Sequence, residues 1–250
     1  TKVGVYAMIR VFTLVFPHPA GEPSTFLLVV AGLTMVSGVL GAASQQATRR
    51  ILSFHIVSQI GYMVLGLALY TPHALAGAIF YLMHHIVVKA NLFLVSGLMR
   101  RHGGAFTLEN LGGLYRRSPL LAVLFLVPAG SLAGFPPLSG FWAKLVLIIA
   151  SLEAGEVLAA VVALAVGFLT IYSMAKIWLA AFWKPASRAP AELPTLRGHA
   201  TTGLPVAALA AITVVMGLWP QPFLAVAERA AGELLDPSAY VDAVLGEGAR

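Results

Sequence analysis

The chain has 250 residues, of which 59% are hydrophobic and 10% are charged. A soluble domain carries roughly 25% charged residues, so this chain has too few charges to cover the surface of one. It is also too rich in apolar residues to be disordered. In such a chain the net charge of +6 is explained mostly by basic loops on one side of a lipid bilayer. It does not indicate nucleic-acid binding, as it would in a soluble chain. The absence of cysteine excludes disulfides, iron–sulfur clusters and cysteine-ligated zinc, and we expect no cofactor. The composition therefore indicates an integral membrane protein.

Proline, glycine and charged clusters divide the chain into seven apolar segments, and a membrane-spanning helix needs about 20 predominantly apolar residues. The segments are residues 1–16, 24–43, 51–70, 74–98, 119–151, 157–183 and 201–219. The first segment has no initiating methionine and none of the features of a signal peptide. We therefore expect the chain to begin inside a helix and to be the C-terminal part of a longer protein.

The fifth segment, residues 119–151, is too long for one straight span. Its centre reads GFPPLSG and contains Gly134, Pro136, Pro137 and Gly140. Two adjacent prolines remove backbone donors and prevent a continuous helix. Irregular backbone at membrane depth is tolerated only inside protein or beside a wet cavity, and broken helices are typical of ion transporters. The alternative interpretation is two complete helices joined by a surface turn.

The distribution of Lys and Arg favours the broken span. If residues 119–151 cross the membrane once, only Arg229 and Arg250 fall on one side. Nine basic residues fall on the other side, namely Arg49, Arg50, Arg100, Arg101, Arg116, Arg117, Lys184, Arg188 and Arg197. Two complete helices would move the last three of these to the opposite side. By the positive-inside rule the arginine-rich side is cytoplasmic and the C-terminal tail is extracytoplasmic.

Two lysines lie deep inside apolar segments. Lys89 is in the middle of the fourth segment, and Lys144 follows the break by two helical turns. A charge at the bilayer centre costs roughly 2.5–3.5 kcal/mol, so such residues by default mark an ion or proton path. Lysine suits this role because it can release its proton, whereas arginine stays charged. Arg10 and Lys176 lie nearer to segment ends, where long side chains reach the interface.

Two histidines precede Lys89 in the sequence HHIVVK. His85 and Lys89 are four residues apart, so they share a helix face and a water molecule can bridge them. His84 points about 100° away, toward a neighbouring helix. A single intramembrane histidine can also be a structural residue held by a hydrogen bond, but we expect the His85/Lys89 pair to be functional. We expect no metal site, because adjacent histidines diverge and no carboxylate is near them.

None of the ten acidic residues lies at the centre of an apolar segment. Buried lysines usually pair with carboxylates. We therefore expect the partner carboxylate in an upstream part of the protein or in another subunit. In the acidic tail, residues 222–247, the apolar side chains of Phe223, Val226, Ala230 and Leu234 have helical spacing, which indicates an amphipathic helix or a contact with another protein.

Four ordered blocks of sequence carry a family resemblance: TKVGVYAMIRVF, RRILSFHIVSQIGYM, HHIVVKANLFLVSG and GFPPLSGFWAK. They resemble the second half of the antiporter-like membrane subunits. This family includes the large subunits of Mrp-type multisubunit Na+/H+ antiporters and the proton-pumping subunits of respiratory complex I. The blocks are most similar to the D subunits of the Mrp type. The resemblance is strong over residues 1–180.

The resemblance implies an all-α polytopic membrane protein that carries most of the second inverted repeat of a 14-helix subunit. We expect about six to seven transmembrane helices here, one of them broken. The domain at residues 1–183 belongs to this repeat. Residues 184–220 are expected to form a cytoplasmic loop and the last transmembrane helix, and residues 221–250 the extracytoplasmic tail.

The resemblance also implies roles for single residues. Lys2 matches a lysine that links two half-channels, and His85 and Lys89 match the His and Lys of a central polar axis. Lys144 matches the terminal lysine near the exit to the outside. The expected relay consists of Lys2, His84, His85, Lys89 and Lys144. Its implied partners are H+, Na+ and the other subunits of a hetero-oligomeric antiporter complex in the cell membrane.

Three other functions stay open at this point. The chain can belong to a proton-pumping subunit of a complex I-type or membrane-hydrogenase oxidoreductase, in which redox chemistry drives the same relay. It can be a scaffold whose lysines only hold subunits together. A weaker alternative is an autonomous channel. In the preferred interpretation the chain is part of a transporter and not an enzyme.

Overall fold

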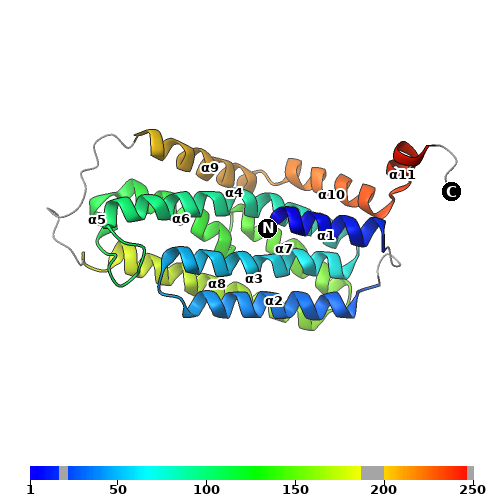
Figure 1. Cartoon of the computed structure of the whole chain (residues 1–250), viewed down its shortest axis with the longest axis horizontal. Helices are drawn as coiled ribbons and strands as arrows, with labels where there is room; N and C mark the ends of the chain where they lie inside the picture. Colours follow the sequence, from blue (N-terminus) through cyan, green and yellow to red (C-terminus); the bar gives the residue numbers. More distant parts are fainter. Residues whose placement is uncertain (17–21, 187–199, 247–250) are drawn as a thin grey trace.

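The computed structural model describes residues 1–16, 22–186 and 200–246, and these are α-helical without a named β-strand. Figure 1 shows an elongated bundle whose main helices run along one direction. Four helices of the described part are long and apolar enough to cross a membrane. They are α2 (Thr25–Ser44), α3 (Thr48–Leu69), α4 (Pro72–Gly103) and α8 (Val157–Trp178), which continues into the π-helix η1 (Leu179–Trp183). The expected all-α membrane fold is confirmed.

The remaining helices are shorter. They are α1 (Lys2–Leu14), α5 (Leu114–Arg117), α6 (Pro119–Ala133), α7 (Ser139–Glu153), α9 (Ala200–Leu218), α10 (Gln221–Leu235) and α11 (Ser238–Leu245). The span predicted for residues 74–98 is longer in the structure: α4 continues through a basic last turn to Gly103 and is capped by Gly104, whose φ is 77°. Glycine adopts this left-handed conformation readily and ends helices in this way.

Helix starts follow local sequence signals. The hydroxyls of Ser24, Thr71 and Ser118 each accept a hydrogen bond from a backbone N–H in the first turn of α2, α4 and α6. Such caps satisfy donors that have no partner inside the helix. Pro72 and Pro119 occupy the first position of α4 and α6, where the missing N–H of proline costs nothing.

Helices α6 and α7 together form one broken span. In Figure 1, α6 begins at the end of the bundle that carries α5, the break lies near mid-length, and α7 continues to the opposite end. There His73 Nδ1, at the start of α4, lies 2.9 Å from Glu153 Oε2, at the end of α7. Two complete helices would have returned α7 to the α5 end. The predicted broken span is therefore confirmed.

The loops at the α5 end are tied to one another. The N–H of Thr48 donates to Phe106 O at 2.9 Å, and the N–H of Gly113 donates to Lys184 O at 2.7 Å. The guanidinium groups of Arg49 and Arg100 both stack on the ring of Phe106. This end carries the basic residues predicted to share one side, apart from Arg188 and Arg197, which lie outside the described residues.

Helices α9 and α10 are joined at a bend of 78° between Leu218 and Gln221. The spacing of apolar residues correctly predicts a helix here: Phe223 and Leu234 of the predicted face pack against the buried cluster, and Ala230 is half-buried. Val226 is 47% exposed, whereas Ala227 and Ala231 are fully buried in the cluster that includes residues of α4. Small side chains four residues apart let α10 lie close to α4, as small residues do between membrane helices.

The close approach of α2 to α3 leads to a first prediction. A Cβ atom added at Gly38 would collide with the backbone of Ser58. We expect Gly38→Ala to destabilise the protein by about 1–3 kcal/mol, the usual cost of overpacking. The measurement is the thermal midpoint of the purified full-length complex. Gly32→Ala on the same helix is the control, since its Cβ would meet nothing within 4 Å; equal midpoints for the two variants would contradict the prediction.

Candidate functional site

The interior of the bundle contains a set of polar side chains contributed by five helices. Lys89 and Lys144 are only 6% and 7% exposed, and no Asp or Glu is buried among the described residues. We call this set the polar axis, and it consists of Lys2, His55, Gln59, Tyr62, Tyr81, His84, His85, Lys89, Ser131, Ser139 and Lys144. All the residues predicted to form a relay belong to it.

Lys144 occupies the break between α6 and α7. Its Nζ donates hydrogen bonds to the carbonyl oxygens of Leu132 at 3.0 Å and Ala133 at 2.9 Å, at the end of α6. The last carbonyls of a helix have no partner within the helix and carry partial negative charge. Nζ also lies 5.6 Å from the centre of the Tyr62 ring, close enough for a cation–π attraction. The break thus stabilises a buried ammonium group with neutral partners.

His84 contacts the other side of the break. Its Nδ1 lies 2.8 Å from the hydroxyl oxygen of Ser139, the first residue of α7. That oxygen lies 3.0 Å from the hydroxyl oxygen of Ser131, which accepts a hydrogen bond from the N–H of Gly140 at 3.2 Å. His84 therefore faces a neighbouring helix, as its position in the sequence predicts. Both halves of the broken span are connected to it through hydroxyl groups.

His85 and Lys89 lie on one face of α4, as predicted. Lys89 Nζ donates to Leu52 O at 3.1 Å, whereas neither ring nitrogen of His85 has a hydrogen-bond partner within the described part of the chain. Lys2 of α1 interacts electrostatically with both residues, and its Nζ lies 3.5 Å from Met63 Sδ. The structure thus brings Lys2, His85 and Lys89 into one group.

Six members of the polar axis are missing from the predicted relay, namely Ser131 and Ser139 at the break and four residues of α3 and α4. His55, Gln59 and Tyr62 come from α3, and Tyr81 comes from α4. The Tyr81 hydroxyl donates to Gln59 Oε1, and the rings of Tyr62 and Tyr81 stack with their centres 5.2 Å apart. Both ring nitrogens of His55 and the Nε2 of Gln59 lack a partner among the described residues. The spacing i, i+4, i+7 of the α3 residues marks one helix face and is the signal that could have identified them.

A cavity of about 260 Å³ lies beside Lys144 between α7 and α8. Gly134 of the break, Lys144 and Phe141 line it from one side, and Gly167 and Phe168 line it from the other. The lysine side chain is therefore reachable from the surface of the chain as well as from the polar axis.

The chemistry of the polar axis suits proton movement better than metal or covalent chemistry. Imidazole nitrogens, hydroxyls and amines both give and take protons. Buried polar atoms without a protein partner are usually satisfied by water, and His55, His85 and Gln59 provide such atoms along the axis. No group of three or more His, Cys, Asp or Glu with the geometry of a metal site occurs in the described ranges.

Comparison with known proteins places the chain in a family. Residues 1–170 match the family model described as NADH:quinone oxidoreductase/Mrp antiporter, transmembrane. The D subunit of the Na+/H+ antiporter of Alkalihalophilus pseudofirmus is 47% identical over 99% of this chain and 50% of its own length. The D subunit of the Bacillus subtilis antiporter is 34% identical with the same coverage. The chain spans about half the length of these relatives.

Solved structures agree with this assignment. A chain of the Mrp complex from Dietzia sp. superimposes with a TM-score of 0.86 and 39% identity, over 98% of this chain and 53% of that one. A chain of the membrane-bound sulfane sulfur reductase, an archaeal respiratory membrane complex, gives a TM-score of 0.84 with 25% identity, over 97% and 49% of the two chains. The protein therefore belongs to the NADH:quinone oxidoreductase/Mrp antiporter family of membrane subunits.

Proposed function

We propose that this chain forms half of a proton-conducting subunit in a multisubunit Na+/H+ antiporter, and that the polar axis relays the protons. The named relatives at 47% and 34% identity are D subunits of such antiporters. In this proposal the subunit works with other subunits in the cell membrane. Its arginine-rich end faces the cytoplasm, because basic loops favour that side, and the tail faces outward.

The observation that carries the proposal is the environment of Lys144. Its Nζ is bonded to two backbone carbonyls and to no carboxylate of the described residues. A neutral amine still donates hydrogen bonds to carbonyls, so Lys144 can lose its proton without losing these contacts. An ion pair would hold the proton much more firmly, since opposite charge favours the charged form. Lys144 is therefore suited to release and regain a proton.

The same reasoning applies along the axis. Lys89 is bonded to the carbonyl of Leu52, and His85 has free ring nitrogens within the described residues. Protons would pass between the group of Lys2, His85 and Lys89 and the break through side chains and bridging water. A proton on one site disfavours a proton on the next by Coulomb repulsion. Such coupling lets protonation move along the axis in steps.

Ion exchange without redox chemistry tests this function. The full-length subunit, assembled with its other subunits, is reconstituted in liposomes that contain no electron donor, and a Na+ gradient is imposed. We expect the gradient to drive proton movement, recorded with a pH-sensitive dye. Proton movement only with an electron donor would favour the oxidoreductase alternative. Lysine variants that assemble poorly but keep full activity per complex would favour the scaffold.

Ser139 provides a second prediction within the axis. Ser139→Ala removes the hydroxyl that lies between His84 and Ser131, so we expect exchange per assembled complex to fall roughly ten-fold or more, given that a positioned proton-transfer group contributes at least that much. Ser151→Ala is the matched control, because the hydroxyl of this buried serine donates to Leu147 O, one turn earlier in the same helix α7. Equal exchange rates for the two variants would contradict the role of Ser139.

A further inference from the structure

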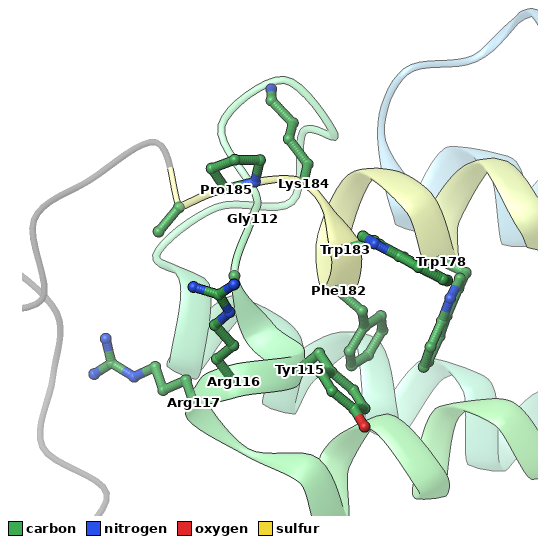
Figure 2. Close-up of a pocket in the computed structure, with 11 residues that line it drawn as sticks. Gly112, Tyr115, Arg116, Arg117, Trp178, Phe182, Trp183, Lys184 and Pro185 are labelled. Atoms are coloured by element: carbon green, nitrogen blue, oxygen red, sulfur yellow. The ribbon is translucent and has the colours of Figure 1, made fainter.

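A second and larger cavity, of about 940 Å³, lies at the arginine-rich end, away from the polar axis. This volume is within the range of roughly 300–1,000 Å³ typical of ligand sites. Figure 2 shows that the cavity combines aromatic walls with basic side chains. The aromatic residues are Tyr115, Trp178, Phe182 and Trp183, and the basic residues are Arg116, Arg117 and Lys184.

The basic residues make the cavity complementary to an anion. Arg116 and Lys184 form no ion pair with a carboxylate of the described residues. Lys184 Nζ donates one hydrogen bond, to Glu109 O at 2.9 Å, and an ammonium group has three donors. Arginine offers a planar fork that matches the oxygens of a phosphate. The charge and the donors both suit a phosphate group.

The surroundings of the cavity are apolar and lie where a membrane surface is expected. The long apolar helix α8 ends here in the π-helix η1, and its Leu179 and Trp183 are 56% and 73% exposed. Leu120, at the start of α6, is also exposed. Trp and Tyr gather at the boundary between bilayer and water, and π-helical turns are frequent at functional sites. A free inorganic anion would use the charges but not this apolar rim.

We propose that this cavity binds an anionic phospholipid, with the headgroup phosphate on Arg116, the positive charges of Arg117 and Lys184 to either side of it (Figure 2), and the acyl chains along the apolar surfaces of α6 and α8. Basic pockets at the ends of membrane helices bind anionic headgroups in this manner. The ring planes of Trp178 and Phe182 are stacked, with their centres 4.8 Å apart, which gives the pocket a rigid wall. The proposal does not depend on the proton path.

Lipid selectivity of the intact complex tests the proposal. The full-length complex is placed in nanodiscs with spin-labelled phosphatidylglycerol or spin-labelled phosphatidylcholine, and the immobilised fraction of each is measured. Arg116→Gln/Lys184→Gln removes two charges from the cavity. Arg50→Gln/Arg101→Gln is the control, since it removes two charges from exposed side chains at the same end.

We expect the cavity variant to lower the preference for phosphatidylglycerol roughly ten-fold or more, because it removes direct donors to the phosphate and one hydrogen bond to a charged group contributes a factor of about ten or more. The control should change the preference far less. Equal losses in both variants would overturn the proposal. Displacement of the immobilised lipid by millimolar inorganic phosphate would identify a site for free phosphate. A crosslink from position 116 to another subunit, in place of lipid, would identify a protein contact. Either result would overturn the lipid proposal too.

Discussion

Lys144→Ala in the full-length subunit, assembled with its other subunits, is expected to lower Na+/H+ exchange roughly a hundred-fold, the scale of effect when a positioned proton-transfer group is removed. The physical reason is that the break between α6 and α7 then holds no group that can take up a proton beside the carbonyls of Leu132 and Ala133. The measurement is the rate of internal pH change in proteoliposomes, divided by the amount of assembled complex.

Lys176 provides a matched control for Lys144. Its Nζ also donates to two backbone carbonyls at the end of a helix, those of Ala43 and Gln45, at 3.0 and 2.8 Å, but it lies outside the polar axis. Lys176→Ala should therefore keep most of the exchange activity. Lys144→Arg should not restore it, because arginine keeps the positive charge but does not release its proton. Normal exchange by Lys144→Arg would show that only the charge matters.

Gly140→Ala is expected to destabilise the assembled protein by about 1–3 kcal/mol and to reduce the amount of complex recovered. A Cβ at this position would collide with the carbonyl oxygen of Ser131 and come within 3.0 Å of the His84 ring. The two halves of the broken span would have to separate at the point where they meet α4. The thermal midpoint of the purified complex and its yield are the measurements.

Gly97→Ala is the control for Gly140→Ala. Gly97 lies in α4, and its added Cβ would meet nothing within 4 Å, so the midpoint should stay the same or rise slightly, since alanine is the better helix former. If Gly140→Ala and Gly97→Ala gave the same midpoint, the tight contact between the halves of the broken span would not be needed for stability.

The course of the chain through the membrane could be predicted from sequence because the bilayer fixes the length of an apolar segment. The pair Pro136–Pro137 within residues 119–151 forced a break, and counting basic residues chose between a broken span and two complete ones. The same logic singled out Lys89 and Lys144, since an ionisable residue in the middle of an apolar run is costly. These features depend on properties that are local in the sequence.

The contacts of the buried residues could not be predicted, because they join positions far apart in the chain. Residue types alone suggest a carboxylate as the partner of a buried lysine. In the structure Lys144 is bonded to the backbone carbonyls at the end of α6, and a backbone partner cannot be recognised from composition. His55 and Gln59 share the third apolar segment with Ser53 and Ser58, so residue type alone does not show which of these polar side chains face the lysines. Their place in the polar axis depends on how α3 packs against α4 and α7.

The central claim, that protons pass in series through the polar axis, is tested most directly by comparing single and combined substitutions. Lys2→Gln, Lys89→Gln and Lys144→Gln are made singly and together, with Lys176→Gln as the control, and proton flux per assembled complex is measured in proteoliposomes under a Na+ gradient. A relay in series stops when any one of its steps is lost, so each single axis variant should be almost as slow as the triple variant. Lys176→Gln should keep its flux. A normal flux through any one of the three single axis variants would contradict the account.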